Sequence, residues 1–221
     1  MRSVPVFALV LTLASFTAAS EKADKTVKLF NGKDLSNWTW HSREEDAPLE
    51  ATWSVEDGRL KCKGQPVGYI RTKQDDYQNY RLVVEWRWPE GSRGGNNGVL
   101  IHTTTPNALG VWPKSLEVQL AHENAGDFWV IGTTVEVPTA EERRKDRRHL
   151  NLTDDSEKPI GEWNQMEIVA RGDKVTVRVN GELVNEATDA SQTKGSISLQ
   201  SEGAPIEFRK VELTPLDAEQ E

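Results

Sequence analysis

Two short segments carry the residues best suited to bind and transform a polar ligand. A glycine turn, Gly94-Gly95, leads into a strand-like run at 96–102, and a second run follows at 116–120. Because side chains alternate between the two faces of a strand, Glu117 and Gln119 share one face of the second run and its aliphatic residues share the other. In a sheet packed on one side, this pattern shows a carboxylate and an amide on an open surface. Such a surface is typical of a sugar-binding site.

The rest of the chain supplies the strands that must position these residues. Runs at 82–88 and 175–179 alternate between apolar and polar residues, and two further strand-like runs occupy 196–200 and 206–213. The run at 175–179 ends at Asn180-Gly181. Asn-Gly is the strongest short-range signal of a β-hairpin, since both turn residues need a positive φ. Short strands separated by turns, with hardly a helical period, predict an all-β sandwich or barrel.

The start of the chain resembles a secretory leader. Arg2 is followed by an apolar run at 4–16 and then by small residues, so we expect residues 1–20 to be a signal peptide. The apolar run is too short to span a bilayer, and no later stretch is long enough to do so. We expect the remainder, 21–221, to form a single domain.

Charge and cysteine content narrow the partners and the compartment. The net charge is −8 and becomes −9 when Arg2 leaves with the signal peptide, which argues against nucleic acid and anionic membrane surfaces as partners. Cys62 is the only cysteine, so the chain has no intrachain disulfide. Export without disulfides favours a bacterial periplasmic or extracellular protein over a eukaryotic secreted one.

One polar segment interrupts the strand pattern. Residues 139–159 contain a run of mixed charge at 141–148. The plainer interpretation is a solvated loop or helical turn. The alternative hypothesis is a flap that covers the site.

Seven blocks, in order along nearly the whole of the predicted domain, resemble the 3-keto-disaccharide hydrolase domain family. They are Leu29-Phe30-Asn31-Gly32-Lys33-Asp34-Leu35-Ser36-Asn37-Trp38, Trp53-Ser54-Val55-Glu56-Asp57-Gly58, Asn96-Asn97-Gly98-Val99, Glu117-Val118-Gln119, Gly161-Glu162-Trp163-Asn164, Val179-Asn180-Gly181, and Ser198-Leu199-Gln200 with Phe208-Arg209. The resemblance implies a concanavalin A-like jelly-roll sandwich of two curved antiparallel sheets. It also implies a secreted hydrolase that cleaves 3-keto-disaccharides or related glycosides, with a small carbohydrate as its partner.

For such a substrate, Glu117 is the candidate catalytic base. A carbonyl at C3 acidifies the neighbouring C2–H, because the resulting carbanion is delocalised as an enolate. A carboxylate whose pKa is raised by partial burial can remove that proton, after which the group at C1 leaves by β-elimination and water adds back. The competing interpretation is an ordinary solvent-facing glutamate.

Four further residues are candidates for sugar binding. Gln119 shares the face of Glu117, and Gln200 and Glu202 lie on the closing strand. Many family members have a histidine where this chain has Glu202, which here supplies a second carboxylate or caps a turn before Gly203. Asn97 presents an amide at the start of its strand, although a turn residue that tolerates positive φ explains it equally well.

His102 is the candidate partner of Glu117. It has the parity of Gly98 and Leu100, so alternation places it on the same face as Glu117. There it would act as an acid/base partner, or bind a divalent cation together with Glu117. The sequence holds no tight metal-ligand spacing and predicts no cofactor outright, and calcium at a purely structural site is an equal alternative.

Eight tryptophans against five phenylalanines are an unusual bias. Indole rings stack well on the C–H faces of sugars, so Trp112 and Trp129, which lie near loop glycines, are candidate sugar platforms. Four others occupy strand-like or motif contexts that favour the core: Trp38, Trp53, Trp86 and Trp163.

Other functions remain as alternatives. Related jelly-roll glucanases often carry paired acids in an E-x-D-x-x-E strand, whereas Glu117-Val118-Gln119 offers one acid, so direct two-carboxylate hydrolysis is less favoured than elimination. A carbohydrate-binding module without turnover is the main alternative to an enzyme. A cell-surface interaction protein, which would rest on the charged run at 141–148, is the least favoured.

Overall fold

The computed structural model describes residues 26–154 and 156–217, so the predicted signal peptide at 1–20 lies outside the described residues. Two antiparallel sheets contain all the strands of the described chain, and its helices are two single turns, α1 (Leu49–Thr52) and α2 (Ala140–Arg143). The all-β prediction is therefore confirmed. Within the described ranges, no helix has the length and apolar character needed to cross a bilayer.

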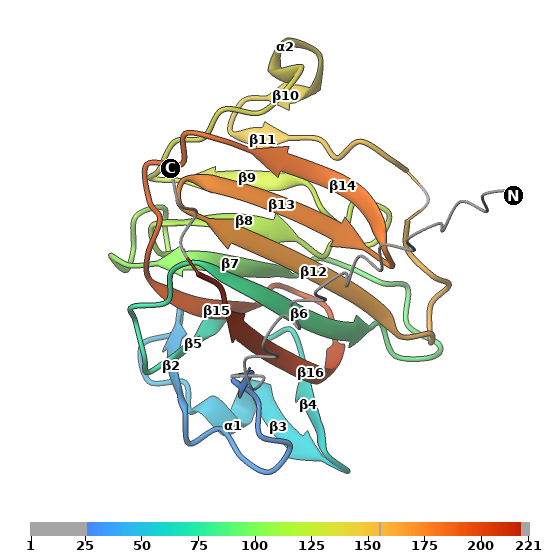
Figure 1. The fold of residues 1–221 in the computed structure, drawn as a ribbon. Helices are drawn as coiled ribbons and strands as arrows, with labels where there is room; N and C mark the ends of the chain where they lie inside the picture. Colours follow the sequence, from blue (N-terminus) through green and yellow to red (C-terminus); the bar gives the residue numbers. More distant parts are fainter. Residues whose placement is uncertain (1–25, 155, 218–221) are drawn as a thin grey trace, which may run out of the picture.

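The first sheet contains the long strands in the middle and at the end of the chain (Figure 1). Its order across the sheet is β14 (Glu182–Ala187), β13 (Lys174–Val179), β12 (Asn164–Arg171), β6 (Tyr80–Arg87), β16 (Ile206–Pro215), β4 (Arg59–Cys62) and β3 (Trp53–Glu56), with β1 (Val27–Lys28) paired to β16. The Asn180-Gly181 turn joins β13 to β14 with φ of 51° and 89°. The predicted hairpin is thus confirmed.

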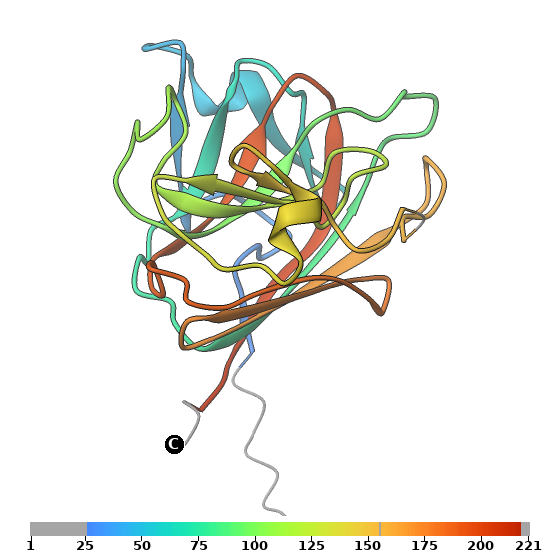
Figure 2. The same ribbon diagram turned by 90° about the horizontal axis from the view of Figure 1, so that it is seen from above.

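The second sheet carries both segments that opened the sequence argument. Its order is β10 (Arg144–Lys145), β11 (Arg148–His149), β9 (Phe128–Ile131), β8 (Ser115–Gln119), β7 (Gly98–Thr103), β15 (Ser196–Ser201), β5 (Gly68–Thr72) and β2 (Trp38–Ser42). Strands that are distant in sequence are neighbours in both sheets, as in a concanavalin A-like jelly roll. In Figure 1, α2, β10 and β11 lie at one end of the two sheets, and Figure 2 looks onto that end.

The core lies between the two sheets and follows the alternation of the strands. Leu82, Val84, Trp86 and Trp88 of the β6 run are each at most 2% exposed and belong to one hydrophobic cluster with the inward residues of the second sheet. Burying a large apolar side chain contributes about 1.5–3 kcal/mol. The other face of the second sheet points away from this core and carries Glu117. We call this face the Glu117 face.

The predicted core tryptophans divide into two groups. Trp38, Trp53 and Trp86 are buried, as predicted. Trp163 is only partly buried, with its ring between the guanidinium groups of Arg87 and Arg209 at 4.7 and 4.6 Å. The core prediction is wrong for this residue, because it precedes β12 and packs against charged side chains on the outer face of the first sheet.

Candidate active site

Gly98 forms the floor of the candidate site. It lies on β7 between β8 and β15, and its register partner is Gln119. A methyl group at Gly98 would lie 2.6 Å from Oε1 of Gln200 and 2.8 Å from Oε1 of Glu117. These two polar side chains therefore approach each other over a position that has no side chain of its own. Such a close approach is one of the uses of glycine within a strand.

Glu117 is a buried carboxyl group on β8. Its side chain is 4% exposed and lies beside Trp129, its register partner on β9. Burial raises the pKa of Glu117 to about 8, with a further contribution from the negative charge of Glu202, while Arg147 and the neighbouring Gln200 amide act in the opposite direction. Desolvation disfavours the charged form of a carboxyl group, which makes the ionised form a stronger base.

Glu202 brings a second carboxyl group to the same place. It follows the end of β15 and forms a β-bridge with Asn96, beside the start of β7. Burial raises the pKa of Glu202 to about 7, against the positive charges of Arg147 and Arg43. Two carboxyl groups that repel each other's charge titrate as a pair, so they hold about one proton between them near neutral pH.

A small pocket of about 80 Å³ joins these groups. Its lining combines two carboxyl groups, two amides, one guanidinium and two indole rings: Glu117, Glu202, Asn96, Gln119, Arg147, Trp112 and Trp129. Convergent polar groups beside aromatic rings and titratable groups with perturbed pKa values are typical of ligand and active sites.

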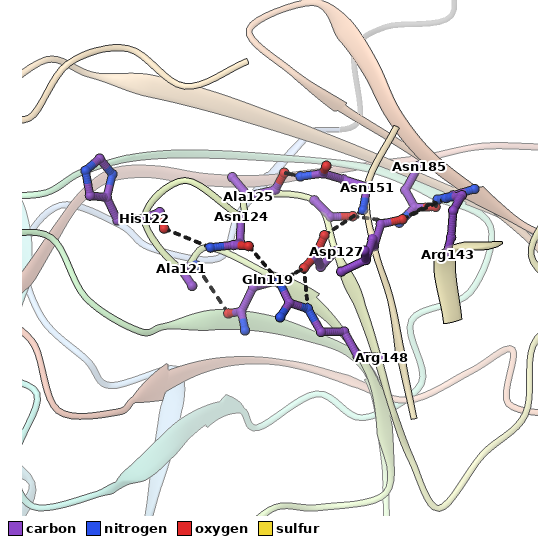
Figure 3. Close-up of polar contacts among 12 residues, drawn as sticks. Gln119, Ala121, His122, Asn124, Ala125, Asp127, Arg143, Arg148, Asn151 and Asn185 are labelled. Carbon is purple, nitrogen blue, oxygen red and sulfur yellow. Dashed lines mark hydrogen bonds and ion pairs between the residues drawn. The ribbon is translucent and has the colours of Figure 1, made fainter. Parts of the chain in front are cut away.

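The amide of Gln119 is oriented by the backbone. Its Oε1 accepts hydrogen bonds from the amides of Leu120 and Ala121 at 3.1 and 3.2 Å, and Figure 3 shows the contact with Ala121. The backbone thus holds the oxygen and leaves the Nε2 group as the donor available to a ligand. Gln119 is therefore a fixed hydrogen-bond donor at the pocket wall.

Gln200 is fully buried, and neither atom of its side-chain amide has a well-formed hydrogen bond with the described residues. Buried amides are nearly always paired, and the polar group near this one is Glu117, whose pKa it lowers. Gln200 is not part of the pocket lining, so the structure places it beside Glu117 rather than at the surface that a ligand would touch. The indole N–H of Trp129 is also buried, and it has no hydrogen-bond partner in the described chain. Its ring also contacts Arg147, whose guanidinium carbon lies 4.6 Å from the ring centroid.

Asn97 does not reach the pocket. It is fully buried, and its Nδ2 donates a hydrogen bond of 2.5 Å to the carbonyl oxygen of Gln200. Since Gly98 faces the pocket, alternation turns the residue before it inward. The substrate-binding prediction for Asn97 is corrected to a positioning role for β15, and the preceding Asn96 lines the pocket instead.

His102 also lies away from Glu117. Its φ of 53° and the register shift between β7 and β15 break the alternation at this residue. The imidazole turns toward the core, where its ring lies 5.6 Å from that of Tyr80 on the first sheet and its Nδ1 contacts the carbonyl oxygen of Gln192 at 2.9 Å. Burial lowers its pKa to about 4. The predicted partnership with Glu117 is corrected, because a β-bulge re-aims a side chain.

The candidate pair of His102 and Glu117 for a divalent cation is not brought together, since His102 turns toward the core. Within residues 26–154 and 156–217, no three His, Cys, Asp or Glu side chains are grouped so that they could hold a metal ion. The acidic partner of Glu117 in this structure is Glu202, not a histidine.

Arg147 is the site residue that sequence reasoning missed. It lies in the turn between β10 and β11, within the charged run at 141–148. The loop and flap interpretations of this run assigned no role to any single residue. Arg148 anchors this turn: its Nε donates to Oδ2 of Asp127 at 2.6 Å, and its Nη2 donates to Oδ1 of Asn124 at 2.6 Å. Arg148, which begins β11, thus fixes the turn that brings the neighbouring Arg147 to the pocket.

A buried polar network continues from this anchor and fixes the segment at 138–152 (Figure 3). The second oxygen of Asp127 accepts the Asn151 amide at 2.6 Å. Arg143, which is 8% exposed, donates to the carbonyl oxygen of Leu150 and, at 2.6 Å, to Oδ1 of Asn185 on β14. Breaking a buried charged network is costly, because it leaves uncompensated charges. The predicted loop is therefore a structured arm tied to both sheets.

Comparisons with known proteins agree with this architecture. The family model described as the 3-keto-alpha-glucoside-1,2-lyase-like domain matches residues 25–214, and no curated protein matches the chain. Two structures of putative glycosyl hydrolases from Parabacteroides distasonis are similar. One is 24% identical with a TM-score of 0.62 over 87% of this chain and 100% of the other; the second is 21% identical with a TM-score of 0.63 over 87% and 94%.

A carbohydrate-binding module from Bacillus subtilis has the same fold. It is 11% identical, with a TM-score of 0.57 over 80% of this chain and 94% of the module. At these identities, the solved structures establish the jelly roll and leave the chemistry to the site.

Proposed function

The chain belongs to the family of 3-keto-α-glucoside-1,2-lyase-like domains, and from this premise we propose that it cleaves the glycosidic bond of 3-keto-glycosides by β-elimination, with Glu117 as the base. The observation that carries the proposal is that two carboxyl groups line one pocket: the buried Glu117, which lies over Gly98, and the half-buried Glu202. A carboxyl pair that holds one proton can remove one proton from a substrate and deliver another. The reacting form has its proton on Glu202 and its charge on Glu117, which is the less populated of the two singly protonated forms because the pKa of Glu117 is the higher one.

The first step is the removal of the C2 proton. The Glu117 carboxylate accepts this proton, and the electron pair of the C2–H bond moves into an enolate whose negative charge rests on the oxygen at C3. The guanidinium of Arg147 is the positive charge at the pocket, and Gln119 adds an oriented N–H donor. Fixed donors and charges in a partly dry site stabilise a developing oxyanion strongly.

The second step breaks the bond between C1 and the glycosidic oxygen. The enolate electrons form the C1=C2 double bond, the C3 carbonyl returns, and the leaving oxygen takes a proton from the carboxylic acid of Glu202. The products are an enone sugar and a free alcohol. When water adds to C1 and a proton returns to C2, the net reaction is hydrolysis and the sugar product is the free 3-keto sugar.

Substrate comparison tests this proposal. We expect the protein to cleave 3-keto-trehalose or 3-keto-sucrose and to leave the unoxidised sugars intact, because only the keto forms have an acidic C2–H. Glu117→Gln should lower kcat/KM by about 10²–10⁴-fold, the usual contribution of a general base. Cleavage of the unoxidised sugars would instead indicate direct hydrolysis by the two carboxyl groups. Binding of sugars without any product would indicate a carbohydrate-binding module.

We also propose that the protein is exported from a bacterial cell. The pattern at 1–20 supports a cleaved signal peptide, and a fold without a disulfide is compatible with the periplasm or the medium. N-terminal sequencing of the protein recovered from cell fractions tests this proposal. A chain that keeps Met1 and stays in the cytoplasmic fraction would contradict it.

A further inference from the structure

An open groove on the β2 side of the second sheet has no role in the mechanism above. It encloses about 520 Å³, which is larger than the pocket at Glu117. Its lining is mixed in polarity: His41, Ser42, Arg43, Glu45, Asn107, Gly110 and Val111.

The strand register places this groove on the Glu117 face. His41 on β2 is the register partner of Tyr69 on β5, and Tyr69 is the partner of Gln200 on β15. The rings of His41 and Tyr69 are 5.1 Å apart, so they point to the same side of the sheet. With neighbouring strands about 4.8 Å apart, His41 is roughly 10 Å from the Gln200 strand, which is a disaccharide-scale distance.

The hairpin at 104–114 forms a wall shared by the groove and the pocket. Leu109 and Trp112 exchange backbone hydrogen bonds of 3.1 and 3.0 Å across its tip. Val111 lines the groove, whereas Trp112 lines the pocket. Both pack in one small apolar cluster with Tyr69, and a 2.9 Å contact between Nε2 of His41 and Oδ1 of Asn107 ties the hairpin to β2. The two hollows are thus parts of one surface.

The order of strands gives this surface a direction. Glu117, Trp129 and the hairpin that carries Arg147 lie on one side of Gly98, and the β15 strand that leads to Glu202 lies on the other, toward β5 and β2. The positive charges of Arg147 and, to a smaller extent, of Arg43 on the groove side both lower the pKa of Glu202 against the effect of burial, so Glu202 lies between the two hollows. The carboxyl group that would protonate the leaving oxygen is therefore the one on the groove side.

We propose that the groove binds the leaving half of the substrate, a hydroxyl-rich sugar unit joined to the 3-keto ring. This inference rests on the proposed function and adds the direction in which the substrate lies. Arg43 offers donors, Glu45 and the Nδ1 of a neutral His41 offer acceptors, and Val111 offers an apolar contact for a ring face. A mixture of donors and acceptors suits hydroxyl groups, which both donate and accept hydrogen bonds.

Calorimetric titration in the Glu117→Gln background measures binding without turnover. The ligands are 3-keto-trehalose, which has a sugar leaving group, and methyl 3-keto-α-glucoside, which has none. We expect the disaccharide to bind about tenfold more tightly, as a few added hydrogen bonds would give. Adding Arg43→Ala should reduce this preference to about twofold or less and leave the affinity for the methyl glycoside unchanged.

Arg178→Ala is the matched control, because Arg178 is an exposed arginine on β13 of the first sheet and should leave the preference intact. Equal affinities for the two ligands, or a preference that survives Arg43→Ala, would overturn the groove assignment. Turnover of the methyl glycoside by the unsubstituted protein is read separately. Its absence would count against the proposed elimination, and the binding preference would still decide the role of the groove.

Discussion

The Glu117 carboxyl group is the proposed catalytic base, and its ionised form destabilises the folded protein. Its side chain is 4% exposed, and it lies near the charge of a second carboxyl group. Arg147 lines the same pocket but forms no ion pair with Glu117 among the described residues, so its charge offsets only part of the cost of ionising a buried carboxyl group. Removal of its charge should therefore stabilise the fold while it abolishes the proposed chemistry.

Thermal unfolding of Glu117→Gln tests whether loss of the charge stabilises the fold. The pKa of Glu117 is about 8 in the folded protein against an ordinary value of 4.5. The folded state therefore binds more protons between these pH values, and its stability falls as the pH rises through them. We expect the Tm of Glu117→Gln to exceed that of the unsubstituted protein by at least about 3 °C at pH 8.5, with little difference near pH 4.5. A lower Tm at pH 8.5 would show that the carboxylate stabilises the fold.

The carboxyl pair predicts a bell-shaped dependence of kcat/KM on pH. The pKa values of about 7 for Glu202 and about 8 for Glu117 place the maximum between pH 7 and 8, where the pair holds one proton. Glu202→Gln should remove the alkaline limb, because the acid is lost. It should also move the remaining acid limb to lower pH, because a negative charge that raises the pKa of Glu117 is gone. An unchanged profile would exclude Glu202 as the proton donor.

Gly98→Ala tests the shape of the site independently of its charges. The added methyl group would meet Gln200 and Glu117 at 2.6 and 2.8 Å. These contacts are with side-chain atoms that can move aside, so the fold should tolerate the change and the site should not. We expect kcat/KM to fall by at least about tenfold, which a displacement of catalytic groups by less than 1 Å can produce, and Tm to change by only a few degrees. Full activity would show that the approach of these two side chains is dispensable.

At the scale of elements, the β10–β11 hairpin determines where Arg147 lies. The ion pair between Arg148 and Asp127 holds this hairpin against β9, and Arg147 lowers the pKa of both Glu117 and Glu202. The arm therefore affects the proposed reaction through the guanidinium of Arg147, which the Arg148–Asp127 ion pair holds in place.

Asp127→Asn should therefore alter the pH profile as well as stability. Without the full charge of Asp127, Arg148 is held less firmly and Arg147 leaves its place. Both limbs of the kcat/KM profile should then move to higher pH, and Arg147→Gln should produce the same shift without a comparable loss of Tm. If Asp127→Asn lowers Tm while the profile stays in place, the ion pair serves the fold alone.

The extent to which the sequence predicts these elements differs from residue to residue. Period-two alternation predicts the shared face of Glu117 and Gln119, and Asn180-Gly181 predicts its hairpin, because both signals are local. Alternation cannot anticipate the positive φ that turns His102 into the core. The place of Arg147 depends on the contacts of its neighbour Arg148 with Asp127 and Asn124, about twenty residues away, which no local pattern encodes.

At the scale of the whole molecule, one sheet supports the site by packing its other face against the partner sheet. Trp86 is fully buried between the sheets, whereas Trp163 lies on the outer face between two arginines. We expect Trp86→Ala to reduce the free energy of unfolding by about 3–5 kcal/mol, and Trp163→Ala to cost clearly less. Denaturant titration measures both. Equal losses would contradict the placement of the core between the sheets.

Cleavage in D₂O tests the central claim, elimination initiated by Glu117, most directly. If the C2 proton is removed and later restored from solvent, the 3-keto sugar released from 3-keto-trehalose carries deuterium at C2, above the level in a control without protein. Glu117→Gln should release labelled product at least about 10²-fold more slowly. Product that retains its original hydrogen at C2 would contradict the account, because the glycosidic bond would then have been broken without elimination.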